Sequence, residues 1–234
     1  MELIILGCDG AYPSANGACS GYLVTQGTDA LLMDCGTGVL PKLMALMDPA
    51  RLSAIALTHW HHDHASDLLT LRYYLEITGH KLPLYAPAGA HPLADLLGDK
   101  AFDRRDVAPG FSAGSMSITA LPVKHSVPAY ALRVQAEGRA LVYTGDISEL
   151  GALPAFCQDA HVLVCDAAFT AAQWCPEQPH ISAQMAARLA LKAPVDKLVL
   201  SHRPPYNDAQ QLLDEARPIF SNTVSAFSGL RLHV

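Results

Sequence analysis

The sequence predicts a layered α/β fold in which helices lie outside a central pair of sheets. Short apolar runs of strand length, bounded by Gly, Asn, Asp or Pro, recur from one end of the 234-residue chain to the other. Segments with apolar residues at helical spacing alternate with these runs. A chain of this length can bury a full apolar core, so we expect residues 1–234 to form one domain.

The first half of the chain opens with sheet and then alternates. Strands are expected at Leu3–Leu6, Gly21–Thr25, Ala30–Asp34, Ala54–Leu57 and Leu82–Ala86. Helices are expected at Leu40–Met47 and Asp67–Ile77.

The second half begins with a mostly antiparallel stretch and then returns to alternation. Strands are expected at Met116–Leu121, Tyr130–Gln135, Ala140–Tyr143, Val162–Cys165, Lys197–Leu200 and Val224–Phe227. Glu137-Gly138 indicates a hairpin between the second and third of these strands. Helices are expected at Ser182–Lys192 and Asp208–Arg217.

Composition excludes several classes of function. The formal net charge of -6 and the lack of a Lys/Arg cluster argue against binding long nucleic acid. No apolar run approaches the roughly 20 residues that a membrane span needs. The first seven residues predict a strand and show no secretion signal. The six cysteines form no Cys-x-x-Cys pair and suit reduced thiols, so we expect a cytoplasmic location.

The segment His59-Trp-His-His-Asp-His64 carries the chemistry of the chain. It directly follows the apolar segment Ala54–Thr58, and four of its six residues are candidate metal ligands, in a sequence with 11 His. Ligand sites in α/β sheets gather at the carboxyl ends of strands, and a loop there lets neighbouring side chains converge. Imidazole and carboxylate groups both suit zinc. We expect Trp60 and His62 to pack around the site, and a helix to begin near Ala65.

This pattern resembles the hallmark of the metallo-β-lactamase superfamily, His-x-His-x-Asp-His after a strand. The resemblance runs from about Met1 to Tyr206 and implies a four-layer αβ/βα sandwich, with two mixed sheets flanked by helices. It also implies two divalent metal ions. The implied ligands are His59, His61 and His125 for the first ion, Asp63, His64 and His202 for the second, and Asp146 for both. Asp34 in Asp34-Cys-Gly36 resembles the family's Asp-x-Gly element, whose carboxylate orients a ligand His.

Within the superfamily, the chain resembles the branch of ribonuclease Z and related phosphodiesterases. His180 in Pro179-His-Ile-Ser-Ala183 matches a His that lies near the leaving group in that branch. The alternative is a structural role for His180 beside Ser182, the residue that caps the next helix. The β-lactamase branch is less similar because it usually has a Cys at the second metal. The resemblance implies that Asp63 orients the attacking hydroxide and that His180 protonates the departing oxygen.

These features predict a binuclear metal-dependent hydrolase that uses a metal-bridging hydroxide. Zinc is the default metal, with manganese and iron as alternatives. Only 20 residues separate His125 from Asp146, which leaves no room for the basic transfer-RNA-binding arm that ribonuclease Z carries there. We therefore expect a small phosphodiester as substrate, selected by the loops Gly7–Ser20 and Trp174–His180. The alternatives are an ester, thioester, lactone or β-lactam hydrolase, and a metal-binding regulator without catalysis. Related proteins often form homodimers, but no residue indicates an interface.

Overall fold

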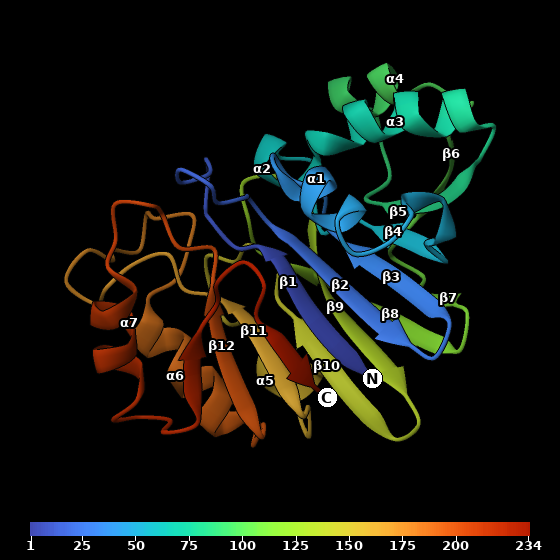
Figure 1. Ribbon diagram of the computed structural model, residues 1–234. Helices are drawn as coiled ribbons and strands as arrows, with labels where there is room; N and C mark the ends of the chain where they lie inside the picture. The colour runs from blue at the N-terminus through green and yellow to red at the C-terminus, as the bar shows by residue number, and fades with distance from the viewer.

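The computed structural model describes residues 1–234 as two seven-stranded sheets that pack face to face (Figure 1). The first sheet has the order β14-β1-β2-β3-β4-β5-β6 and the second has the order β13-β12-β11-β10-β9-β8-β7. The first contains β1 (Glu2–Gly7), β2 (Gly21–Gln26), β3 (Asp29–Met33), β4 (Ala54–Ala56), β5 (Leu82–Ala86), β6 (Phe102–Asp106) and β14 (Arg231–His233). The second contains β7 (Phe111–Ala113), β8 (Met116–Val123), β9 (Ala129–Ala136), β10 (Arg139–Tyr143), β11 (Val162–Asp166), β12 (Lys197–Ser201) and β13 (Thr223–Ser225).

Both sheets are mixed. In the first, β1 to β3 pair antiparallel and β3 to β6 pair parallel. In the second, β7 to β10 pair antiparallel and β10 to β13 pair parallel. Parallel strands need crossover connections, so the helices follow from this topology.

Helices cover the outer face of each sheet (Figure 1). Those on the first sheet are α1 (Val39–Met44), α2 (His62–Ala65), α3 (Asp67–Thr78) and α4 (Pro92–Leu97), with a 3-10 turn at Pro49–Arg51. Those on the second sheet are α5 (Leu153–Phe156), α6 (Ala183–Lys192) and α7 (Ala209–Ala216). The predicted αβ/βα sandwich is confirmed. None of the helices is both long and apolar enough to cross a bilayer.

Alternation along β1 shows how the layers are held together. Leu3 and Ile5 point into the core between the two sheets, whereas Ile4 and Leu6 point into the core beneath the helices of the first sheet. Successive side chains of a strand face opposite sides, so a strand buried on both faces is apolar throughout. On α3, Leu68, Leu71 and Leu75 are fully buried on one side of the helix.

The structure adds elements that the sequence pattern conceals. Four of the five residues of β6 are exposed and charged, so the strand has no apolar period and forms through backbone pairing with β5. The three-residue β14 joins the sheet by pairing with β1. Likewise, α4, α5 and β7 have at most six residues, which is too short for a period to be visible. The expected strand near Val224 is β13, which begins one residue earlier and ends at Ser225.

Candidate metal centre

The metal-binding motif lies at the carboxyl end of β4, as predicted, but its backbone differs from the prediction. The helical turn α2 begins at His62, three residues before the expected start. Asp63 and His64 therefore lie on a turn of helix, and only His59 and His61 lie on the loop before it. Trp60 is buried in the outer core, where its indole N–H donates to the Pro87 carbonyl at 3.1 Å. This packing anchors the loop between the two histidines.

The second sheet supplies the remaining predicted ligands from the same end of the molecule. His125 lies in the connection between β8 and β9, Asp146 follows β10, and His202 follows β12. The fold thus brings together all seven predicted ligands from segments far apart in the chain, in two groups that share Asp146.

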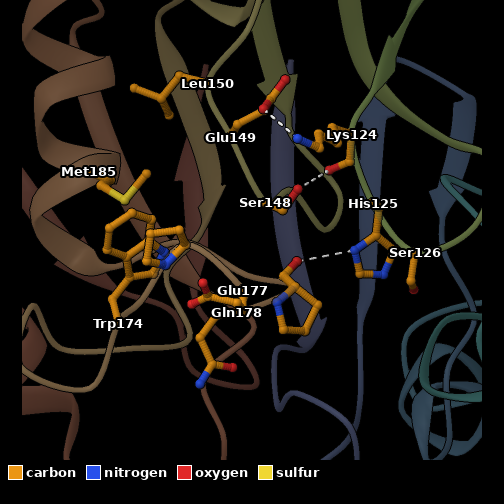
Figure 2. A pocket seen from close by; sticks show the side chains of 12 residues that line it. Lys124, His125, Ser126, Ser148, Glu149, Leu150, Trp174, Glu177, Gln178 and Met185 are labelled. Carbon is orange, nitrogen blue, oxygen red and sulfur yellow. Dashed lines mark hydrogen bonds and ion pairs between the residues drawn. The ribbon is translucent and has the colours of Figure 1, made fainter.

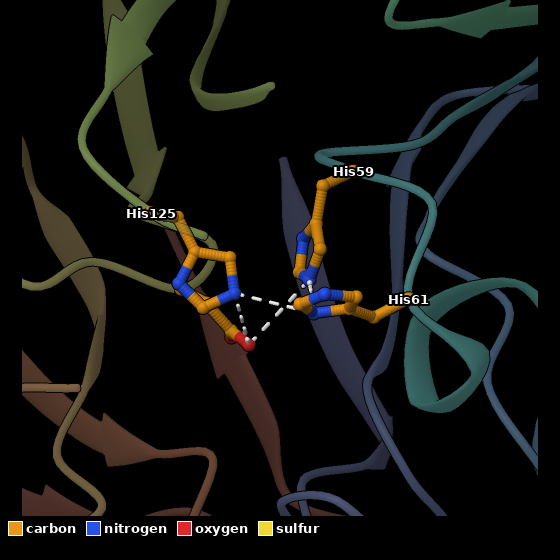
Figure 3. A group of neighbouring side chains, drawn as sticks. His59, His61 and His125 are labelled. Carbon is orange, nitrogen blue, oxygen red and sulfur yellow. Dashed lines mark hydrogen bonds and ion pairs between the residues drawn. The ribbon is translucent and has the colours of Figure 1, made fainter. Parts of the chain in front are cut away.

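The first group consists of His59, His61, His125 and Asp146. Figure 3 shows the three imidazole rings converging from opposite sides. His61 Nδ1 lies 3.0 Å from His59 Nε2 and 3.2 Å from His125 Nε2. Asp146 Oδ2 lies 3.5 Å from His59 Nε2. Nitrogen ligands held tetrahedrally at the usual Zn–N distance are separated by roughly 3.3 Å, so this spacing fits one zinc-sized ion.

The second group consists of four buried residues, Asp63, His64, Asp146 and His202. Asp146 Oδ1 lies 3.3 Å from His64 Nε2 and 3.3 Å from His202 Nδ1. Asp63 Oδ2 lies 3.7 Å from His64 Nε2. One oxygen of Asp146 thus faces each group, which is the arrangement that a bridging carboxylate needs.

Two atoms of the second group show that these residues fit a cation. His64 Nε2 and Asp146 Oδ1 are buried and have no hydrogen-bond partner. A buried polar atom without a partner costs about 1–3 kcal/mol, and a bound cation would satisfy both atoms at once. In the first group, burial holds the pKa of His59 well below its usual range. The neutral ring then keeps an electron pair available for a metal.

Asp34 orients His64 from behind, as the resemblance implies. Its carboxylate lies 2.7 Å from His64 Nδ1 and accepts hydrogen bonds from the Thr58 backbone N–H at 2.8 Å and the Thr58 hydroxyl at 2.9 Å. If Nδ1 carries the proton, Nε2 of His64 faces the second group as a free ligand atom. Asp34 itself has a positive φ of 57°. Strained backbone of this kind persists only where its surroundings enforce it.

His180 lies at the edge of both groups. Its ring centroid is 4.7 Å from that of His202 and 5.5 Å from that of His125. Its Nδ1 lies 2.9 Å from the buried carboxylate of Asp166. Burial lowers the pKa of His180, but the charge of Asp166, the hydrogen bond to it and the charge of Asp146 together raise the pKa to about 9. The Ser182 hydroxyl caps α6 by accepting from the Met185 N–H, so His180 has no part in that cap.

Sequence reasoning missed Asp166, which the structure places behind His180. Asp166 ends β11, and its carboxylate also accepts from the backbone N–H groups of Ile147 and Ala168. The only signal in the sequence was a carboxylate at the end of a buried strand. Such a residue has many structural roles, so its pairing with His180 becomes visible only in three dimensions.

The loop Gly7–Ser20 packs directly against the second group. The Ala11 N–H donates to Asp63 Oδ2 at 2.9 Å. A Cβ atom added to Gly10 would lie 2.6 Å from the His202 carbonyl oxygen and 2.9 Å from its ring, so only glycine fits there. The loop therefore positions ligands, whichever part it also plays toward a substrate.

A cavity of about 540 Å³ opens beside the first group (Figure 2). His125 forms one wall, and its Nδ1 lies 3.2 Å from the Pro179 carbonyl oxygen. The opposite wall comes from the loop Trp174–Pro179 and from Met185 of α6. Lys124 and Glu149 form an exposed ion pair at 2.9 Å across the rim. The cavity is within the size range of pockets for small ligands.

An αβ/βα sandwich that carries paired His/Asp groups at one end of its two sheets defines a metal-dependent hydrolase. A family model described as "Beta-lactamase superfamily domain" matches residues 29–203. The chain belongs to this family.

Relatives and solved structures agree with this assignment. The "Probable metallo-hydrolase YhfI" of Bacillus subtilis is 32% identical over 96% of both chains. Its crystal structure superimposes with a TM-score of 0.94, covering 99% of this chain and 98% of that one. A ribonuclease Z of Methanopyrus kandleri is 27% identical over 100% of this chain and 98% of its own. A diphosphatase of the PhnP family shares the fold at 18% identity, with a TM-score of 0.79 and coverage of 100% and 97%.

Proposed function

We propose that this chain, acting as one hydrolase domain, is a binuclear phosphodiesterase for small phosphodiesters. The observation that carries the proposal is Asp146, whose two carboxylate oxygens face two separate groups of ligand atoms. Zinc is the default metal because both groups offer imidazole nitrogen and carboxylate oxygen, with manganese and iron as alternatives.

The metal ions and Asp63 have different parts in the proposed reaction. Two divalent ions, when bound, supply Lewis acidity at the phosphoryl oxygens and lower the pKa of water toward neutrality. Asp63 has the most accessible side chain of the second group, with 11% exposed, and orients the attacking water. The Ala11 N–H fixes one of its oxygens for this purpose. Phosphoryl transfer gains most from such positioning and from charge stabilisation.

His180 acts as the general acid in this scheme. Asp166 holds its Nδ1 and keeps the ring protonated at neutral pH, so Nε2 donates a proton to the departing oxygen. His180 directly follows Pro179 in the chain and its ring centroid lies 5.5 Å from that of His125, and both neighbours line the cavity. In this scheme the alcohol that leaves would therefore enter the cavity. The cavity is the place that this scheme proposes for the leaving group.

The cavity supports a small, weakly charged leaving group over a transfer RNA. Glu149 and Glu177 both line it, while Lys124 is its one cationic side chain and is already paired with Glu149. Between His125 and Asp146 the chain forms only β9, the turn at Glu137-Gly138 and β10, so no protruding arm extends from this segment. A polyanion would meet repulsion here, and affinity for nucleic acid depends mainly on phosphate contacts.

The similarity to ribonuclease Z favours RNA as the second candidate substrate. A panel assay of metal-loaded protein separates the candidates: bis(4-nitrophenyl) phosphate and a 3′,5′-cyclic nucleotide, a precursor transfer RNA, a lactone, and nitrocefin. The proposal expects turnover of the first two only. Asp146→Ala is the matched inactive control for contaminating enzymes. Turnover of a carbonyl substrate without phosphodiester turnover would overturn the proposal, and so would efficient cleavage of the transfer RNA precursor. Binding of metal with no turnover at all would favour a regulatory protein.

A further inference from the structure

Two buried tyrosines reach in opposite directions across the space between the sheets. Tyr22 on β2 of the first sheet hydrogen-bonds through its hydroxyl to Ser201 Oγ, at the end of β12 in the second sheet, at 2.6 Å. Tyr143 at the end of β10 in the second sheet donates its hydroxyl to Asp34 Oδ2, after β3 in the first sheet, at 2.9 Å. Neither tyrosine exposes more than 1% of its surface.

The two aromatic rings also contact each other. Their centroids lie 4.4 Å apart with the planes tilted by 47°. Close aromatic pairs of this kind attract each other beyond the effect of the area that they bury. Each ring therefore limits where the other can lie, and the two cross-sheet hydrogen bonds form one unit, which we call the tyrosine pair.

Each end of the tyrosine pair is bonded to a group that carries a predicted ligand of the second ion. Asp34 also holds Nδ1 of His64 at 2.7 Å. Ser201 directly precedes His202, whose backbone has a positive φ of 56°. Tyr143 itself lies three residues before Asp146 on the same segment. The tyrosine pair thus lies beneath the second group and touches the supports of its ligands from both sheets.

The hydroxyls carry a role that packing alone does not require. Both rings belong to the apolar cluster between the sheets, and Phe could fill both ring positions with the same ring contact. Burying a hydroxyl is costly unless it forms a hydrogen bond. Each Tyr hydroxyl therefore holds its own sheet at a fixed distance from its hydrogen-bond partner on the other sheet. His64 comes from the first sheet, whereas His202 and Asp146 come from the second, so this distance sets the width of the second group.

We propose that Tyr22 and Tyr143 are positioning residues for the second metal ion, fixing the separation of the two sheets where His64, Asp146 and His202 meet. The inference rests on the proposed two-ion centre but is independent of the bond that the enzyme hydrolyses. Residues that hold metal ligands from behind typically change metal affinity by about 10- to 100-fold when replaced. We expect Tyr143→Phe to act more strongly than Tyr22→Phe, since Asp34 contacts a ligand directly and Ser201 acts through the backbone.

The experiment is a zinc titration of metal-depleted full-length protein, by calorimetry and by competition with a chromogenic chelator. Wild type is expected to bind two equivalents. Tyr143→Phe should weaken one of the two steps by about 10-fold or more while leaving the other within about twofold. Tyr22→Phe should weaken the same step by a smaller factor. In the double variant the two effects should not add, because the rings share one contact.

Tyr85→Phe provides the matched control. Tyr85 belongs to the same core between the sheets, but its hydroxyl accepts from Arg105 at 2.9 Å and not from a residue that holds a ligand. It should lower the unfolding temperature without changing either zinc affinity. Unchanged zinc affinities in both Tyr143→Phe and Tyr22→Phe would overturn the inference, as would an equal loss in Tyr85→Phe. If Tyr143→Phe does not fold, Tyr22→Phe decides the question. A wild type that binds no zinc would instead contradict the two-ion centre itself.

Discussion

Asp166 holds Nδ1 of His180 at 2.9 Å and is itself fixed by two backbone N–H groups at the end of β11. The carboxylate is buried, whereas the His180 side chain is 17% exposed. The charge of a buried partner is screened little by water, so it shifts the pKa of the imidazole strongly. The pair is the main reason why the pKa of His180 is raised to about 9.

Asp166→Asn should therefore move the alkaline limb of the kcat profile to lower pH. With a pKa raised to about 9, His180 is protonated below that pH and loses its proton above it. Without the carboxylate, we expect the pKa of His180 to fall toward the ordinary value of about 6.5, so at pH 8 the protonated fraction drops about 30-fold. The measurement is kcat against pH from 5.5 to 10 with a 3′,5′-cyclic nucleotide, whose leaving group is an alkoxide.

The leaving group supplies the control for this prediction. Departure of 4-nitrophenolate needs little protonation, so kcat for bis(4-nitrophenyl) phosphate should fall much less in Asp166→Asn than kcat for the cyclic nucleotide. His180→Asn should show the same contrast more strongly. An equal loss on both substrates would point to a damaged metal centre rather than a lost acid. Zinc content of each variant, measured in parallel, separates these outcomes.

Removal of the metal should destabilise the fold. His64 Nε2 and Asp146 Oδ1 are buried in the folded protein without a hydrogen-bond partner, and ligands that bind only the folded state stabilise it. With free zinc at about 100 times its dissociation constant, the gain is about 2.7 kcal/mol per site. A thermal melt with chelator and with added zinc should show a rise in midpoint that grows with zinc concentration. Magnesium at equal concentration is the control, because it prefers oxygen ligands. A midpoint independent of zinc would contradict the site.

Asp146→Ala should remove both ions, since this carboxylate faces both groups. We expect metal content, measured by elemental analysis, to fall from about two equivalents to near zero. His61→Ala is the matched comparison, because His61 belongs only to the first group and should leave the second ion in place. Retention of one ion in Asp146→Ala would show that the carboxylate serves a single site.

The resemblance to the superfamily supplied the seven predicted ligands, and the structure brings these side chains together in two groups. His59, His125, Asp146 and His202 each follow a strand, and the sheet topology brings these strand ends to one end of the molecule. The supports were less visible. Asp166 and the tyrosine pair act across the interface between sheets, and neither their spacing nor their residue types distinguishes them from ordinary core positions.

Short or polar elements of the fold were hidden for a related reason. The strand β6 is formed by residues whose side chains are charged, so backbone pairing with β5 decides its structure and no apolar pattern reports it. The turn α2 is hidden within the metal-binding motif, where the residue types are fixed by ligation rather than by helix propensity. The local sequence pattern therefore predicts helices and strands with apolar faces, but it does not predict those that form through tertiary contacts.

Gly10 offers a direct test of how the N-terminal loop acts on the second metal ion. A methyl group at this position would lie within 3 Å of both the carbonyl oxygen and the ring of His202, so Gly10→Ala must push His202 or the loop outward. Overpacking of this kind costs typically about 1–3 kcal/mol, and the displaced ring should bind its ion more weakly. We expect a lower unfolding temperature, weaker binding of one zinc equivalent and reduced kcat.

The neighbouring Ala11→Gly is the control, because Ala11 has a positive φ of 61° that glycine adopts without strain. It should leave zinc affinity unchanged and keep or raise stability. If Gly10→Ala keeps wild-type affinity for both zinc ions, the loop does not position His202, and its contact with the ligand is packing alone.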